Sequence, residues 1–124
     1  MAQLPNLDNA AITTVGGLTV ERAVYDATRD LVYATVSPSG APFPNGNSIA
    51  IVDPNNPQQV SFVTGAGSNP NVIDIADDDS IVYFGVDGAS GFRSFDPETF
   101  QFGPIQGLTV GLSSSAAILE DIAV

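Results

Sequence analysis

The chain has 124 residues, of which 44% are hydrophobic and 14% are charged, so it is long enough to bury a single hydrophobic core. Its 14 acidic residues outnumber 3 arginines, and lysine and histidine are absent, which gives a net charge of −11. This balance argues against nucleic acid or an anionic membrane surface as a partner, because both require clustered cations. No apolar run approaches the roughly 20 residues that cross a bilayer, so we expect no membrane insertion.

The missing residue types also remove several classes of enzyme. Without histidine, cysteine or lysine, the chain has no Ser-His-Asp triad, no cysteine nucleophile, no P-loop lysine and no Schiff-base lysine. The acidic composition suits an extracellular or cell-surface protein, in which self-repulsion maintains solubility, although an acidic cytoplasmic protein has the same composition. We therefore expect an extracellular or cell-surface location and leave the cytoplasm open.

Short segments rich in Val, Ile, Phe, Tyr and Thr alternate with turns that contain Gly, Pro, Asn and Asp. This pattern is typical of an all-β protein, and no window carries apolar residues at helical spacing over three turns. The sequence therefore predicts almost no helix and the following strands: 11–15, 21–26, 31–36, 48–52, 59–64, 71–75, 81–86, 91–95, 99–102 and 116–123.

Two short sequences recur along the chain. Residues 31–33 (Leu-Val-Tyr) return as residues 81–83 (Ile-Val-Tyr), and residues 51–54 return as residues 94–97, each ending in Asp-Pro. A repeat of about 43 to 50 residues is typical of the four-stranded antiparallel blades of a β-propeller. The chain thus predicts a single β-propeller-like unit with an incomplete ring: one blade over about 21–64, a second over about 70–103, and a partial third over 116–124.

The second strand of each predicted blade is apolar or small at nearly every position, in residues 31–36 and 81–86. A strand with one wet face alternates between apolar and polar residues, so these strands are expected to be covered on both faces, as when blade stacks on blade. A β-sandwich and a β-solenoid remain the alternatives. Two blades alone leave apolar faces uncovered, so the expected partner is protein: further copies of the chain, or the remaining blades of a longer propeller.

The chain resembles the YVTN or lactonase-like β-propeller repeat over about residues 12–124. The resemblance lies in an Asn-Pro entry at residues 68–72, an acidic turn, a Val-Tyr strand at residues 81–84 and a strand that ends in Asp96-Pro97. It implies a propeller whose ligands lie on the innermost strands. If Ala27, Ala76 and Ala123 are equivalent, then Tyr25, Asp74 and Asp121 share one level of that site.

Carboxylates are the remaining candidates for chemistry. Asp74 and Asp121 would hold a divalent cation that polarises a lactone carbonyl, as the resemblance implies. Asp77 and Asp79 lie in one acidic turn whose hard oxygen ligands suit Ca²⁺, but the turn lacks the Asp-x-Asp-x-Asp-Gly loop closed by a Glu, so a solvated turn is the favoured interpretation. We predict no organic cofactor and no catalytic residue, and keep Ca²⁺ or another divalent cation at Asp74, Asp121, Asp77 and Asp79 as a hypothesis.

The functional prediction is a non-enzymatic structural or interaction module built from propeller blades. It would be secreted or surface-associated and completed by self-association or by a longer parent chain. The alternatives are a fragment of a lactonase-like, metal-dependent hydrolase and a subunit of an extracellular fibre.

Overall fold

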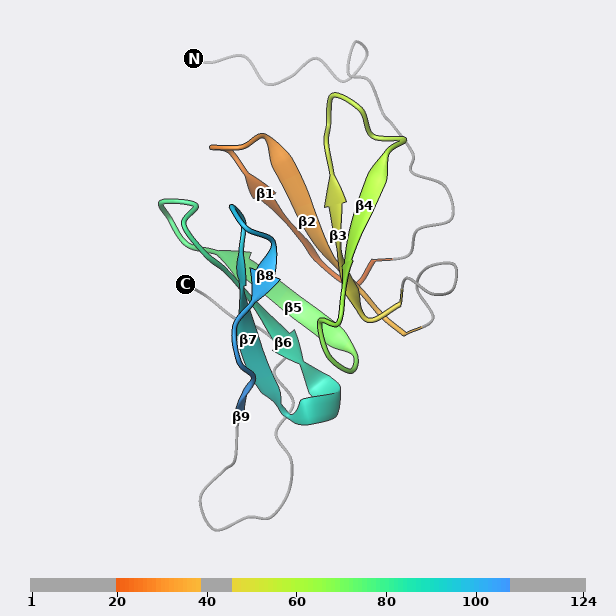
Figure 1. The fold of residues 1–124 in the computed structure, drawn as a ribbon, viewed down its shortest axis with the longest axis vertical. Coiled ribbons are helices and arrows are strands. Elements are labelled where there is room, and N and C mark those ends of the chain that lie inside the picture. The colour runs from red at the N-terminus through yellow and green to blue at the C-terminus, as the bar shows by residue number, and fades with distance from the viewer. Residues whose placement is uncertain (1–19, 39–45, 108–124) are drawn as a thin grey trace, which may run out of the picture.

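A computed structural model describes residues 20–38 and 46–107, and these residues form two antiparallel β-sheets (Figure 1). One sheet has four strands and the other five, and the described residues do not form a closed ring. The helical structure in this part of the chain is one 3-10 turn, η1 (Asp87–Ala89). The all-β class predicted from the sequence is confirmed.

The first sheet is a meander in which each strand pairs with the next along the chain. Turns rich in Asp, Asn and Pro connect strands with β-branched residues, so local preference and pairing agree. Its strands are β1 (Ala23–Asp26), β2 (Leu31–Val36), β3 (Ser48–Val52) and β4 (Val60–Thr64).

The second sheet repeats this meander and adds one short strand. The addition, β9 (Gln106–Gly107), pairs with the start of β7. The four strands in meander order are β5 (Pro70–Ile75), β6 (Val82–Val86), β7 (Gly91–Asp96) and β8 (Gln101–Phe102).

Eight of the ten predicted strands lie within the described residues, and all eight are present. The strands predicted at 11–15 and 116–123, and with them the partial blade at 116–124, lie outside those residues. β8 is shorter than predicted because Phe100 has a φ of 57° in the left-handed region, which extends the preceding turn. β9 was not predicted, since two residues carry too little pattern to be recognised.

The two sheets share one pairing register. Residues 27–30 connect Asp26 to its partner Leu31, and residues 77–80 connect Ala76 to Ile81, whose carbonyl accepts a hydrogen bond from the Ala76 amide. Tyr33 pairs with Ile51 as Tyr83 pairs with Ser94. We call residues at the same place in the two registers counterparts, so Tyr33 and Tyr83 are counterparts and so are Ile51 and Ser94.

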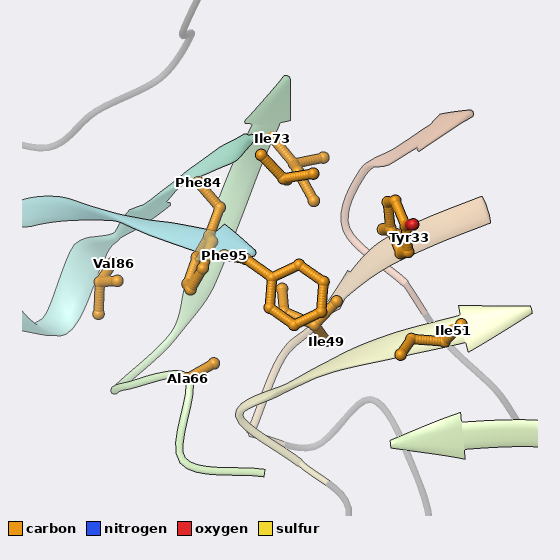
Figure 2. Packing of buried hydrophobic residues seen from close by; sticks show 9 residues of the cluster. Tyr33, Ile49, Ile51, Ala66, Ile73, Phe84, Val86 and Phe95 are labelled. Atoms are coloured by element: carbon orange, nitrogen blue, oxygen red, sulfur yellow. The ribbon is translucent and has the colours of Figure 1, made fainter. Parts of the chain in front are cut away.

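The main hydrophobic core lies between the sheets (Figure 2). Tyr33 and Phe95 meet there edge to face, with ring centroids 5.6 Å apart. We call the face that each sheet turns toward this core its inner face. The core consists of Tyr33, Ile49 and Ile51 from the first sheet, Ile73, Val82, Phe84, Val86 and Phe95 from the second, and Ala66 from the linker.

The first sheet is also buried on its outer face. Val36 and Ala50 are fully buried and form a second cluster with Ala34, against which Phe62 packs. Because side chains alternate along a strand, Tyr33 and Val36 lie on opposite faces of β2. The prediction that this strand is covered on both faces is therefore confirmed for residues 33–36, whereas in residues 81–86 the outer-face Tyr83 is only half-buried.

Candidate functional site

A carboxylate and an arginine organise the turn end of the interface between the sheets. Asp26 is fully buried, and its side chain accepts hydrogen bonds from the Tyr33 hydroxyl (2.7 Å), the Arg29 amide (3.1 Å) and Arg29 Nη1 (3.0 Å). Burial alone would raise the pKa of Asp26, but these hydrogen bonds outweigh it and the pKa is lowered. Burial, followed by the bond to Asp26, raises the pKa of Tyr33.

Arg29 also joins the two sheets. Its Nη1 donates to the Asp79 carbonyl (2.8 Å) and its Nη2 to Glu98 Oε1 (3.0 Å), both in turns of the second sheet. The neighbouring Thr28 donates its amide (3.1 Å) and its hydroxyl (2.8 Å) to Asp79 Oδ2. The side-chain hydrogen bond to Asp26 is the main reason why the pKa of Arg29 is raised.

Arg93 holds the opposite end of the interface. Its Nη1 donates to the carbonyls of Gly65 (3.1 Å) and Ala66 (3.2 Å) in the linker between the sheets, and its Nε donates to the Gly103 carbonyl (2.9 Å). The guanidinium also lies over the Phe102 ring, 4.9 Å from the centroid. Burial lowers the pKa of Arg93, but its charge is retained at neutral pH.

The outer face of the second sheet is the candidate site. By alternation from the core residues Val82 and Phe84, this face carries Asp74, Tyr83, Phe92 and Ser94. The rings of Tyr83 and Phe92 meet edge to face at 6.3 Å, and both side chains are half-buried. The face thus combines an aromatic centre with polar side chains, a composition typical of protein-binding surfaces.

The two sheets stack in the same sense. The first sheet buries Val24, Tyr33 and Ile51 against the second. The counterparts of these residues are Asp74, Tyr83 and Ser94, and they lie on the outer face of the second sheet. The outer face of the second sheet is therefore built from the same repeat positions as the inner face of the first sheet, which the second sheet covers.

Each sheet carries a pocket at its turn end, and the two pockets are counterparts. The first has a volume of about 290 Å³ and is closed on one side by Phe100, from the second sheet; the first sheet contributes Leu31, Ile51, Asp53, Asn56, Gln59 and Ser61. The second pocket, about 310 Å³, has their counterparts in the same order: Ile81, Ser94, Asp96, Thr99, Gln101 and Gly103. Its remaining lining residues, Ser80 and Phe102, also belong to the second sheet.

The predicted metal ligands lie at separate places. Asp74 is on the outer face of β5, where Oδ1 accepts a hydrogen bond from the Ile75 amide (2.9 Å), whereas Asp77 is exposed in the turn between β5 and β6. Asp79, in the same turn, directs its carboxylate to Thr28. Within residues 20–38 and 46–107 no three acidic side chains form a group suited to a metal ion. Asp121 lies outside these residues, and cation binding stays a prediction.

The prediction that Tyr25 and Asp74 occupy equivalent positions on the innermost strands is wrong, because the assumed alignment is shifted by one residue. The pairing of Asp26 with Leu31 and of Ala76 with Ile81 makes Tyr25 the counterpart of Ile75, and Asp74 the counterpart of Val24. The error came from aligning Ala27 with Ala76, and a shift of one residue moves a side chain to the opposite face of a strand. Tyr25 and Asp74 therefore do not share a level.

Sequence reasoning missed the roles of Asp26, Arg29 and Arg93. Asp26 was placed only at the end of the predicted strand 21–26, because a buried carboxylate has no signal in a single sequence. The small number of arginines, three in the chain, was visible in the composition, but the contacts of Arg29 with the second sheet and of Arg93 with the linker were not. The paired pockets were also open to prediction, since both adjoin an Asp-Pro turn that the repeat contains.

Comparisons with protein-family models, with curated proteins and with solved structures found no match. In the part of the chain that the structure describes, no helix has the length and apolarity needed to span a membrane.

Proposed function

We propose that this chain is a non-enzymatic structural or interaction module built from β-propeller blades, secreted or surface-associated, and completed by self-association or by a longer parent chain. The observation that supports it best is the same-sense stacking of the two sheets. In a two-layer sandwich the same face of each sheet meets its equivalent, so no such face is left over. Here the first sheet uses one face and the second sheet the opposite one, so the outer face of the second sheet is equivalent to the inner face of the first and stays uncovered.

The composition of that face supports an interaction role. Tyr83 and Phe92 are half-buried on one surface of a four-stranded meander, and aromatic residues contribute strongly to protein interfaces. The net charge of −11 adds long-range repulsion that would keep an extracellular chain from non-specific association.

The proposal is tested by the mass of the particle in solution. Sedimentation equilibrium of the purified chain over a wide concentration range should give a mass that rises above 12.8 kDa as the concentration increases. A folded species of 12.8 kDa at every concentration would contradict completion by self-association. Extending the chain with its native flanking sequence would then test completion by a longer parent chain.

A further inference from the structure

The contact between the two sheets indicates how another sheet could pack on the outer face of the second sheet. The inner face of the first sheet receives the second sheet, and the same positions recur on the outer face of the second sheet as Asp74, Tyr83 and Ser94. A sheet that docks there in the same way must present positions like those of Ile73, Ile75 and Val82, which the second sheet uses. Their counterparts in the first sheet are Ala23, Tyr25 and Val32, on its outer face.

The outer face of the first sheet is open at its turn end. Tyr25 there is 52% exposed, although its counterpart Ile75 packs against the core between the sheets. Val32 and Val52 beside it are half-buried, whereas Val36 and Ala50 at the opposite end are fully buried. Only the turn end is therefore available for contact, and this is also the end at which the second sheet carries its pocket.

The pocket of the second sheet fits the corresponding turn. In the internal interface Phe100 closes the pocket of the first sheet, from the turn that follows Asp96-Pro97. The equivalent turn of the first sheet follows Asp53-Pro54 and is one residue longer, and its half-buried Pro57 is an apolar side chain that this turn can present.

The charges at this contact distinguish a first-sheet turn from a second-sheet turn. The internal contact pairs Arg29 with Glu98. The counterpart of Arg29 is Asp79, whose carboxylate is turned toward Thr28 of the first sheet, so a partner that brings Glu98 would meet no arginine at that position and would approach the acidic Asp96 of the pocket. The counterpart of Glu98 is Asn55, an amide that already donates to the carboxylate of Asp30 at 2.9 Å and is able to donate to an acidic turn. A first sheet fits this face better than a second sheet does.

We propose that the outer face of the second sheet, centred on Tyr83, Phe92 and the pocket beside Ser94, binds the turn end of the first sheet of a second copy of this chain. The contact is head to tail, with Tyr25 and Pro57 of the second copy against the aromatic pair and the pocket. This inference rests on the proposed function and specifies which two surfaces meet.

The test uses the full chain with one surface altered at a time. Tyr83→Glu removes the acceptor surface and Tyr25→Glu the donor surface, and each should weaken self-association about tenfold or more in sedimentation velocity. Tyr25→Phe, which keeps the ring, should associate like the unaltered chain. Ile105→Glu is the matched control, because it places the same charge at an exposed apolar side chain on neither surface. Cooperative thermal unfolding of each variant shows that it is folded, and Phe92→Ser replaces Tyr83→Glu if that variant unfolds.

Mixing the two variants decides the geometry. Tyr83→Glu retains the donor surface and Tyr25→Glu the acceptor surface, so an equimolar mixture should form a dimer that does not grow further. If Tyr25→Glu associates normally while Tyr83→Glu does not, two outer faces of the second sheet meet symmetrically, and the head-to-tail inference is overturned while the proposed function stands. A monomeric unaltered chain overturns the inference, whereas the proposed function then depends on the longer parent chain.

Discussion

The two sheets follow one repeat but differ in how completely they are buried. In the first sheet, residues on both faces of β2 and β3 are buried, including the polar Thr35 and Ser48. In the second sheet the inner positions of β6 are fully buried, but Tyr83 on the outer side is only half-buried. The difference shows that the repeat specifies the meander and its register. Which faces are buried depends instead on the segments that pack against each sheet.

The largest expected effect separates the two faces of the second sheet. Phe84→Ala empties a fully buried position in the core and should lower the free energy of unfolding by about 3–5 kcal/mol. Phe92→Ala, on the outer face and opposite Gly85 in the ladder, should cost about 1 kcal/mol under conditions in which the chain is monomeric. Urea unfolding of both variants measures the difference, and equal losses would mean that the outer face is also core.

The next effect concerns the buried carboxylate of Asp26 and its pH dependence. Its folded-state pKa lies below the unfolded value of about 3.9, so its contribution is complete above that value and is lost as the pH falls through the folded pKa. Asp26→Asn should lower stability at pH 7 by about 2–3 kcal/mol, because hydrogen bonds to a charged acceptor are the stronger ones. Thermal melts between about pH 2 and pH 7, a range that includes the unfolded pKa of Asp26, should show a smaller acid-induced loss of stability in the variant than in the unaltered chain. Parallel curves of stability against pH would show that the Asp26 carboxylate does not cause the acid-induced loss.

A smaller effect compares the outer faces of the two sheets directly. Val36→Thr adds a hydroxyl at a fully buried position of the first sheet and should cost about 1–2 kcal/mol. Phe92→Tyr adds a hydroxyl to the half-buried outer face of the second sheet, where water reaches it, and should change stability by less than about 0.5 kcal/mol. Chemical denaturation of the two variants would show no such contrast if both faces were equally wet.

The smallest effect lies at the exposed part of the contact between the sheets. The Glu98 side chain is 75% exposed, so Glu98→Gln should reduce stability by no more than about 0.5–1 kcal/mol, and added salt should abolish the difference. Arg29→Gln should cost more, since Arg29 also donates to the buried Asp26 and to the Asp79 carbonyl. Denaturation at low and high ionic strength measures both, and equal costs would assign the whole contribution of Arg29 to the surface pair.

The strands and the repeated turns beside the pockets were predictable from the sequence, but the contacts between the sheets were not. Alternation between strand and turn residues located β1 to β8, and the repeated Asp-Pro steps at residues 53–54 and 96–97 located equivalent turns, because these are local preferences. The direction of the Asp79 carboxylate and the placement of the Arg29 guanidinium depend on contacts between residues about 50 positions apart, namely between residues 28–29 and 79. Such contacts follow from the stacking of the sheets, which no local pattern encodes.

The arginine contacts at the two ends of the interface also restrict the geometry of any larger assembly. Arg29 ties the turns together at one end, and Arg93 ties the linker to the second sheet at the other, so the two sheets are held at both ends of their contact. A fixed tilt per sheet becomes a fixed curvature when the contact is repeated. These two side chains would therefore fix every second tilt in a stack of copies, because the contact between copies has Asp79 in place of Arg29.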